Sequence, residues 1–329
     1  MLPQETKELL SKSKNLLAFS AGVDSTALLF LLLEHKIPFD IAIVDYGLRP
    51  QSKEEVAYAK KLAKEYSFNC YTLNAPKITT NFEAKARELR YDFFQNLIEE
   101  HSYNNLLTAH HLGDRFEWMM MQFCKGAGCA ELTGMQSIEQ RSNYRVVRPL
   151  LQLEKAELKE YLKANQIHYF EDESNSEMRY KRNRFRKLLS PLLAEYKEGI
   201  KRSFNYIDED RALLIEPLEV VKINQLTIIK ASTSQRSNIY AIDKELKALG
   251  VMMSAPQRAL LKEQNSTVIA RKYIVTQQRG YILIAPYIKQ EKFTKEFKEK
   301  MRSLKIDPKL RAYLASDFEA VAFLSERFL

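Results

Sequence analysis

The chain has 329 residues and a formal net charge of +9, from 51 Lys and Arg against 42 Asp and Glu. Its length fits two domains or one large α/β domain with an appendage, and 45% hydrophobic residues suffice for a packed core. The three cysteines form no CxxC pair, which argues against a zinc ribbon or a disulfide framework. A polar N-terminus and the lack of a long apolar run favour a cytoplasmic protein without membrane contact. The positive charge favours a polyanionic partner, although an ordinary basic protein fits it equally well.

Residues 1–150 alternate short apolar runs with amphipathic stretches. We expect strands at residues 16–19, 41–46, 69–73 and 105–109, and helices at 26–35, 53–66, 81–101 and 112–124. Apolar strands that alternate with helices are typical of a parallel sheet covered on both faces, so we predict a Rossmann-like, doubly wound α/β fold. Ligands of such sheets bind beyond the carboxyl ends of the strands, where Ser20–Ser25, Asp45 and His110–Asp114 are placed.

The rest of the chain changes in character. We expect a fifth strand at residues 144–151, a helix at 154–165, a polar loop at 171–176 and a basic helix from 179 to about 196. Beyond about residue 199, a helical stretch to 215 precedes strands at 227–230, 267–270, 272–277 and 281–285, helices at 239–249 and 256–263, and a Lys-rich tail. This pattern is typical of a small α+β unit. We therefore divide the chain into residues 1–200, with a helical extension, and residues 201–329.

The segment Ser20–Ser25 joins an apolar strand to an apolar helix. Free N–H groups and the dipole at a helix N-terminus make an anion site, Ser20 and Ser25 add hydroxyl donors, and Gly22 permits close approach of a ligand. The loop lacks the Lys of GxxxxGK[ST], so it is not the usual phosphate loop of kinases and GTPases. The alternative is that Asp24 or Ser25 only caps the helix.

A second polar group lies at residues 110–117. Asp114 and Glu117 are three residues apart and share one helix face, with His110 just before that helix. A histidine and two carboxylates fit either a metal ion or a cationic substrate. An acidic first turn that only complements the helix dipole is the alternative.

Basic residues form two further groups. Arg87, Arg90 and Tyr91 lie near one another on a helix, where Arg87 could stabilise charge on phosphates or belong to a salt-bridged surface. In residues 179–187, six of nine side chains are basic and two are aromatic, which is typical of a nucleic-acid contact or of a solvated basic helix. The Gly-containing loop at 125–128 fits either a cover over a substrate or a helix end.

The loop Ser20–Ser25 resembles the SGGxDS loop of the ATP-pyrophosphatases, with Ala21 in place of the second glycine. If Ala21 requires a positive φ, the substitution costs roughly 1 kcal/mol. Further motifs, in the same order along residues 15–195, resemble those of the tRNA(Ile)-lysidine synthetases. They are residues 44–49 (VDHGLR, with Tyr46 for His), 86–91 (ARxxRY), 109–118 (AHHxDDQxET), 126–134 (the Gly-rich loop), 148–151, 171–175 and 179–186 (RYxRNxxR). In the motif at residues 109–118, Gly113, Arg115 and Trp118 replace Asp, Gln and Thr.

The resemblance implies a ligase with a PP-loop fold that uses ATP and Mg²⁺. ATP would adenylate the C2 oxygen of the wobble cytidine in a CAU anticodon of tRNA(Ile), and free L-lysine would displace AMP. The implied ATP contacts are Ser20, Ala21, Gly22, Val23, Asp24, Ser25 and Asp45, with Asp24 as the Mg²⁺ ligand. The implied catalytic residues are Asp24, Arg87, His110, Asp114 and Glu117, of which the last three would bind lysine. Arg179, Lys181, Arg182, Arg184, Arg186, Lys187 and the C-terminal domain would bind tRNA.

Three other functions fit parts of the sequence. A tRNA thiolase of the same superfamily is disfavoured because many of these carry paired cysteines. A catalytically inactive RNA-binding relative is suggested by Ala21 and Gly113. A small-molecule amide-forming enzyme, such as an NAD synthetase, would have little use for the basic helix. The C-terminal part resembles the first such domain of longer members, a second one is not recognised, and the sequence does not decide between a monomer and a homodimer.

Overall fold

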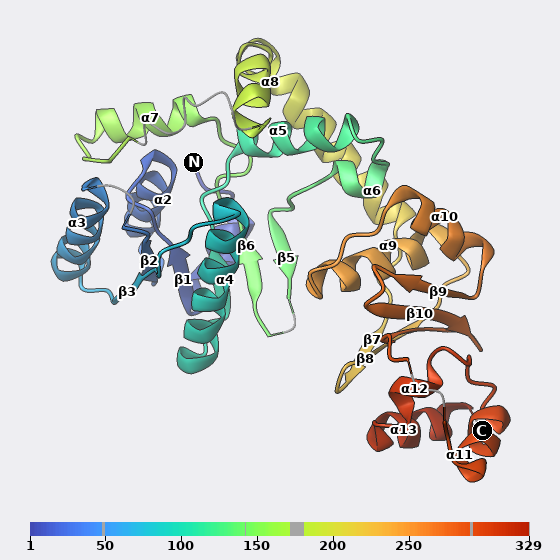
Figure 1. Cartoon of the computed structure of the whole chain (residues 1–329). Coiled ribbons are helices and arrows are strands. Elements are labelled where there is room, and N and C mark those ends of the chain that lie inside the picture. The colour runs from blue at the N-terminus through green and yellow to red at the C-terminus, as the bar shows by residue number, and fades with distance from the viewer. Residues whose placement is uncertain (48–49, 142, 172–180, 290–291, 329) are drawn as a thin grey trace. The chain divides into compact units, whose positions relative to one another are not determined.

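The computed structural model describes residues 1–47, 50–141, 143–171, 181–289 and 292–328 (Figure 1). The chain divides into two compact units, Met1–Ile207 and Asp208–Leu329. This division and the sequence-based one after residue 200 both fall within a long helix, α8 (Lys181–Leu214), whose regular dihedral angles are interrupted at Tyr196. In the described part of the chain, no helix combines the length and apolar character that crossing a membrane requires.

The N-terminal unit contains a six-stranded sheet in the order β3-β2-β1-β4-β6-β5. The strands are β1 (Asn15–Ala18), β2 (Asp40–Asp45), β3 (Cys70–Asn74), β4 (Asn105–Leu107), β5 (Ile138–Gln140) and β6 (Arg145–Val147). All neighbours are parallel except β5, which pairs antiparallel with β6 at the edge. The predicted doubly wound α/β sheet is confirmed.

Helices cover both faces of this sheet (Figure 1). They are α1 (Gln4–Ser11), α2 (Val23–Glu34), α3 (Gln51–Tyr66), α4 (Phe82–His101), α5 (Leu112–Phe123), α6 (Cys129–Leu132), α7 (Lys155–Ala164) and α8. The side chains of β1 alternate between the faces: Leu17 packs in a core with α2, α3 and α7, whereas Leu16 packs against α4. Loops after the strands are therefore held at one edge by a rigid scaffold.

Two sequence-based expectations for this unit were wrong. The fifth strand is only Arg145–Val147, because Pro149 follows and the backbone turns, with Leu151 N–H donating to Arg148 C=O (3.3 Å). Strand β5 was missed because its three residues, Ile-Glu-Gln, carry no apolar alternation.

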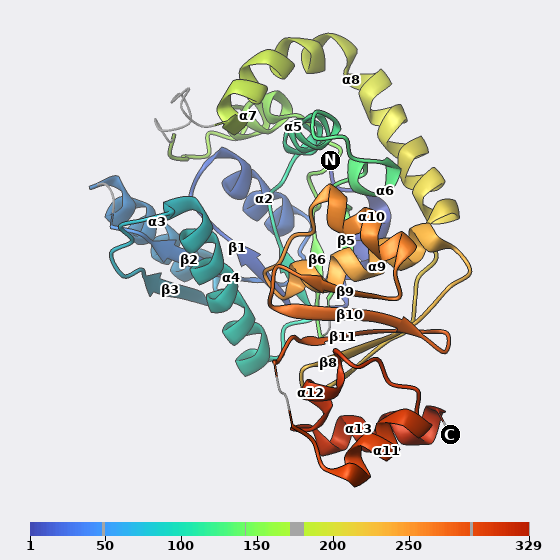
Figure 2. The ribbon, with the colours of Figure 1, turned by 45° about the vertical axis from the view of Figure 1, so that its right-hand side comes forward.

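The C-terminal unit is built on an antiparallel sheet in the order β7-β8-β11-β10-β9. Its elements are β7 (Val220–Ile223), β8 (Leu226–Lys230), α9 (Gln235–Ala248), α10 (Ala255–Glu263), β9 (Ser266–Ile269), β10 (Tyr273–Gln278), β11 (Tyr281–Pro286), α11 (Lys295–Ser303), α12 (Arg311–Leu314) and α13 (Phe318–Phe328). The sheet lies between α9 and α10 on one face and α11 to α13 on the other (Figure 2). The predicted α+β class and the β10–β11 hairpin are confirmed.

The Lys-rich tail folds into helices that sequence reasoning did not identify. Phe297, Met301 and Leu304 follow the spacing of one helix face, and Met301 and Leu304 are fully buried in the core beneath the sheet. The dense exposed lysines obscured this apolar pattern. Strand β7 was also missed, because only alternate residues of its four are shielded.

Candidate active site

The loop Ser20–Ser25, called the phosphate loop below, links β1 to the N-terminus of α2. Helix α2 begins at Val23 with Gly22 as its N-cap, so the first-turn N–H groups of α2 point out of the helix end. Ser20 N–H donates to Ser25 Oγ (3.2 Å), and the two hydroxyl oxygens lie 3.1 Å apart. Hydroxyl and N–H donors are thus gathered at one helix N-terminus, the arrangement that favours an anion.

Ala21 adopts a left-handed conformation, which favours the glycine that the SGGxDS motif has at this position. Its φ is +57° and its side chain is fully buried. The carbonyl oxygen of Ala21 accepts a hydrogen bond from Phe170 N–H (3.0 Å), which holds the loop against the segment before the undescribed residues. The methyl group therefore strains the loop by roughly 1 kcal/mol without unfolding it.

A cavity of about 480 Å³ opens beside the phosphate loop. It is lined by Ser20, Gly22, Val23, Asp24, Ile43, Val44, Tyr46, Glu55, Arg90, Lys155, Lys159, Phe170 and Glu171. The walls combine apolar side chains of β2 with three cations, a composition that suits a nucleotide with several phosphates.

Asp24 has one oxygen available to a cation. Its buried Oδ1 has no hydrogen-bond partner among the described residues, while Oδ2 lies 3.6 Å from Lys155 Nζ. An orphaned carboxylate oxygen next to a phosphate site fits Mg²⁺, which takes few protein ligands and completes its shell with phosphate and water. Among the described residues, no group of three or more His, Cys, Asp and Glu could hold a metal by itself.

Lys155 and Lys159 are site candidates that sequence reasoning missed. They lie one turn apart on α7, and Lys159 Nζ contacts Glu171 Oε1 at 2.8 Å. One signal was available: Lys155 occupies the first position of α7, where the helix dipole disfavours a cation. A lysine in that position is better explained by an anion nearby.

The segment after β2 and the start of α4 form one wall. Asp45, the last residue of β2, accepts a hydrogen bond from Gly47 N–H (2.7 Å), so it shapes the turn there. Tyr46, which lines the cavity, donates to Ala86 C=O (3.1 Å) and thereby fastens α4. Arg87 is exposed and stacks on Tyr91, with its guanidinium carbon 4.6 Å from the ring centroid.

The start of α5 fixes the second polar group. His111 is the N-cap: its Nδ1 accepts from Gly113 N–H (3.0 Å), and its own N–H donates to Asp114 Oδ2 (3.0 Å). A Cβ on Gly113 would lie 2.8 Å from His111 Cε1. In this structure, a side chain at position 113 would require the His111 ring to shift.

Asp114 and Glu117 are buried against two arginines of α8. Glu117 accepts from Arg182 Nε (2.9 Å) and from Arg186 Nε (2.7 Å). Asp114 Oδ1 accepts from Arg182 as well and lies 4.0 Å from Arg186. These four residues, called the acid–arginine cluster below, balance two negative charges with two positive ones.

Charge and burial set the protonation states here. Burial raises the pKa of Asp114, but His111 and Arg182 outweigh it and hold the pKa at about 2. Burial lowers the pKa of His110 to about 4; Asp114 opposes this effect, and the charges of Arg148, Arg182 and Arg87 add to it. His110 is therefore neutral at pH 7 and lies within electrostatic reach of both Asp114 and Arg87.

The basic segment divides between two sides of α8. Arg182 and Arg186 face the carboxylates, whereas Arg184 and Lys187 are exposed and lie on other sides of the helix. Arg179 and the side chain of Lys181 lie outside the described residues. The sequence identified the basic residues but not the two carboxylate partners.

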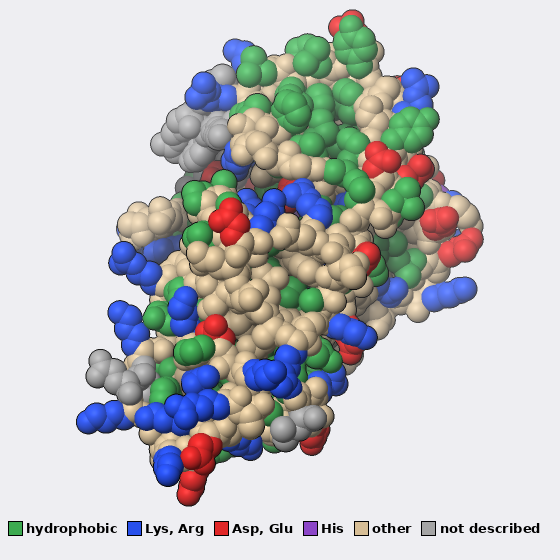
Figure 3. Space-filling model, turned by 90° about the vertical axis from the view of Figure 1, so that its right-hand side faces the viewer, with side chains coloured by type: hydrophobic (Ala, Val, Ile, Leu, Met, Phe, Trp, Pro, Cys, Tyr) green, Lys and Arg blue, Asp and Glu red, His purple; other side chains and the backbone are tan. Residues whose placement is uncertain are grey.

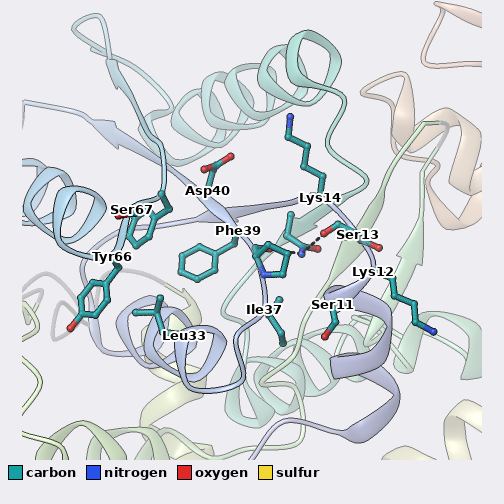
Figure 4. Close-up of a pocket in the computed structure, with 13 residues that line it drawn as sticks. Ser11, Lys12, Ser13, Lys14, Leu33, Ile37, Phe39, Asp40, Tyr66 and Ser67 are labelled. Carbon is teal, nitrogen blue, oxygen red and sulfur yellow. Dashed lines mark hydrogen bonds between the residues drawn. The ribbon is translucent and has the colours of Figure 1, made fainter.

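A larger cavity, of about 650 Å³, lies at the opposite end of the sheet, where β1 and β2 begin (Figure 4). Its polar residues serve the fold: Asp40 accepts from Asn69 N–H and the Tyr103 hydroxyl, and the Asn15 amide donates to Pro38 C=O. Because parallel sheets bind ligands at the carboxyl ends of their strands, the candidate active site is the phosphate-loop edge.

Comparisons with known proteins identify the family of the chain. Residues 2–193 match the family model described as a PP-loop domain. The chain is 43% identical to a tRNA(Ile)-lysidine synthase of Wolinella succinogenes over 310 residues, covering 94% of this chain and 95% of the relative. It is 42% identical to that of Helicobacter pylori, covering 94% and 92%. The chain is a member of the tRNA(Ile)-lysidine synthase family. Its phosphate loop and its acid–arginine cluster both fall within the PP-loop domain.

A solved structure shows the same fold at greater distance. The U34-tRNA thiolase NcsA of Methanococcus maripaludis, a protein with a [4Fe-4S] cluster, aligns with a TM-score of 0.52 and 19% identity. The alignment covers 63% of this chain and 78% of the thiolase. The three cysteines here, Cys70, Cys124 and Cys129, are free thiols.

Proposed function

We propose that this chain ligates L-lysine to C2 of the wobble cytidine in the CAU anticodon of tRNA(Ile), using ATP and releasing AMP and pyrophosphate. The observation that carries this proposal is the 41–43% identity to tRNA(Ile)-lysidine synthases over 94–95% of the chain. The site geometry supports the individual roles.

The phosphate loop and its cavity are proposed to bind ATP. First-turn N–H groups of α2, with Ser20 and Ser25, would contact the phosphates, and Asp24 would hold Mg²⁺ through its orphaned Oδ1. Mg²⁺ would neutralise charge on the departing pyrophosphate. Lys155 and Lys159 place positive charge where that pyrophosphate forms.

The acid–arginine cluster is proposed to bind lysine. Its carboxylates already contact both arginines, and we propose that a lysine ammonium group replaces one of them. Arg182 is the better candidate for replacement, because its side chain is 45% exposed against 30% for Arg186. The neutral His110 would orient the amine that reacts, and Arg87 would steady the adenylyl group.

The proposed chemistry has two steps. The C2 oxygen of cytidine attacks the α-phosphorus of ATP, and the bond to the β-phosphate breaks with release of pyrophosphate. A lysine amine then attacks C2, the C2–O bond breaks with release of AMP, and the amine loses a proton. In this scheme, Lys155 and Lys159 stabilise the departing pyrophosphate, and Arg87 stabilises the departing AMP.

Contacts with tRNA are proposed for exposed cations of both units. Arg184 and Lys187 on α8 are available in the N-terminal unit. In residues 201–329, Lys and Arg side chains gather over the helical end of the unit (Figure 3), with exposed residues Lys292, Lys295, Lys298, Lys300 and Arg302. Free thiols fit the reducing cytoplasm in which such an enzyme would act.

Two features that suggested an inactive relative have local structural reasons. Ala21 tolerates the left-handed conformation of the loop, and Gly113 makes room for the His111 ring. Neither substitution removes Asp24, Asp114 or Glu117. No cysteine lies among the cavity-lining residues, which disfavours a thiolase.

Transfer of labelled lysine tests the proposal. Purified protein is incubated with ATP, Mg²⁺, radiolabelled lysine and tRNA(Ile) with a CAU anticodon, and acid-insoluble label is counted. We expect incorporation that needs ATP and disappears in Asp24→Ala. Pyrophosphate release on addition of tRNA, without any incorporation, would show that lysine is the wrong nucleophile.

A further inference from the structure

Trp118 is an exposed aromatic residue on the acidic side of α5. Successive helix residues turn by about 100°, so Trp118 lies about 40° around the axis from Asp114 and about 100° from Glu117. Its side chain is 43% exposed, although the neighbouring residues of this helix up to Glu117 are buried. Trp118 and Asp114 are thus neighbours on the surface of α5, one turn apart.

The indole is seated on glycine backbone. A Cβ on Gly134 would lie 2.4 Å from Trp118 Cδ1 and 3.0 Å from its Nε1, and Gly134 has a φ of +60°. Only glycine combines this conformation with so close a contact. The pyrrole side of the ring is thus held in place while other parts remain accessible, and little side-chain freedom is left to lose on binding.

The chemistry of the ring points to a nucleobase. If the site modifies cytidine, that base must leave its stack, and its neighbours in a single-stranded loop then expose their faces. Exposed bases of single strands stack on aromatic side chains, whatever the sequence, since every base has a π-face. Threonine, which the family motif has in place of Trp118, cannot make this contact.

We propose that Trp118 is a stacking platform for an unpaired base of the RNA substrate, next to the cytidine that reacts. The inference rests on the proposed function, because it requires an RNA at this site. It assigns to Trp118 a positioning role: stacking would fix the anticodon loop while the cytidine enters the site.

The chain offers a direct probe, since Trp118 is its one tryptophan. An RNA hairpin with the CAU anticodon loop is titrated into the protein, and tryptophan emission is compared with bound RNA measured by filter binding. We expect the emission to be quenched in proportion to bound RNA. We also expect Trp118→Leu to weaken binding about tenfold, a typical stacking loss, and Trp118→Phe to retain most of the affinity.

Phe123 provides the matched control. It is exposed on α5 but points about 140° away from Trp118 around the helix, so Phe123→Leu should leave RNA affinity unchanged. Unchanged emission at saturating RNA would overturn the inference. Equal RNA affinity of Trp118→Leu and the wild type would also overturn it, because packing on Gly134 would then be the whole role of Trp118.

The same samples separate this inference from the proposed function. Quenching without lysine incorporation would leave the stacking role standing and contradict lysine ligation. Lysine incorporation without quenching would support ligation and overturn the stacking role.

Discussion

The phosphate loop and the acid–arginine cluster follow neighbouring strands of one sheet, but their contacts span very different lengths of chain. In the phosphate loop, Ser20 and Ser25 are five residues apart. In the acid–arginine cluster, Glu117 contacts Arg182 and Arg186, which are 65 and 69 residues further along. The loop is specified by one local segment, whereas the cluster exists only when α5 and α8 pack together.

This difference has a consequence for charge. In the phosphate loop, Asp24 Oδ1 has no hydrogen-bond partner among the described residues, and this supports the proposed Mg²⁺ site. The carboxylates of the cluster already contact two arginines, so the proposed binding of lysine there would be an exchange of partners. Lysine affinity should therefore depend on how easily Arg182 leaves, and not only on the number of carboxylates.

Among the contacts that the sequence did not predict, the largest effect is expected where the loop meets α7. Lys155→Ala removes a cation from the wall of the cavity, and we expect kcat/KM for ATP to fall about 30-fold, which corresponds to one lost charge-assisted contact of about 2 kcal/mol. ATP–pyrophosphate exchange in the presence of tRNA measures this. Lys163→Ala, on the same helix but outside the cavity lining, is the control. Equal losses in both variants would contradict a specific role for Lys155.

The cluster is tested next, through stability. Arg186→Ala leaves the buried Glu117 with one arginine, so we expect the free energy of unfolding to fall by about 2 kcal/mol. Arg184→Ala, on the exposed side of α8, should change the free energy of unfolding by less than about 0.5 kcal/mol. It should instead weaken tRNA binding and make that binding less sensitive to salt. Urea unfolding and filter binding give both values. If the two variants were equally stable, the ion pairs of Arg186 would contribute nothing.

His110 gives a pH-dependent test of the same region. Its pKa is about 4 in the folded chain and near 6.5 when unfolded, so between these values the unfolded state binds more protons. Stability conferred by neutral His110 is complete above pH 6.5 and falls as the pH drops to 4, with a slope of at most about 1.4 kcal/mol per pH unit. His110→Gln should flatten the profile in this window. The stability conferred by ionised Asp114, whose pKa is about 2, is lost only at lower pH. Parallel profiles of the two proteins would contradict burial of His110.

The smallest effect is expected in the loop itself. Ala21→Gly relieves a left-handed alanine but adds freedom to the unfolded chain, so we expect a net stabilisation of about 0.5 kcal/mol. Thermal unfolding measures it. A loss of stability would mean that the methyl contact in the core outweighs the strain.

The sequence was informative where contacts are local. The strand–loop–helix at Ser20–Ser25, the α/β class and the shared face of Asp114 and Glu117 all follow from spacing within one segment. Partners were not predictable where they come from distant segments: Lys155 beside Asp24, the arginines on Glu117, and Gly134 under Trp118. The Gly113 and Ala21 substitutions looked like losses until the His111 ring and the φ of the loop gave their reasons.

Measuring the two half-reactions separately tests most directly the claim that both regions serve one ligation. With tRNA(Ile) and ATP, pyrophosphate release reports the first step, and incorporation of labelled lysine reports the second. We predict that Asp24→Asn abolishes both, whereas Glu117→Gln still releases pyrophosphate but incorporates little lysine. Pyrophosphate release by Asp24→Asn, or normal lysine incorporation by Glu117→Gln, would contradict this division of roles.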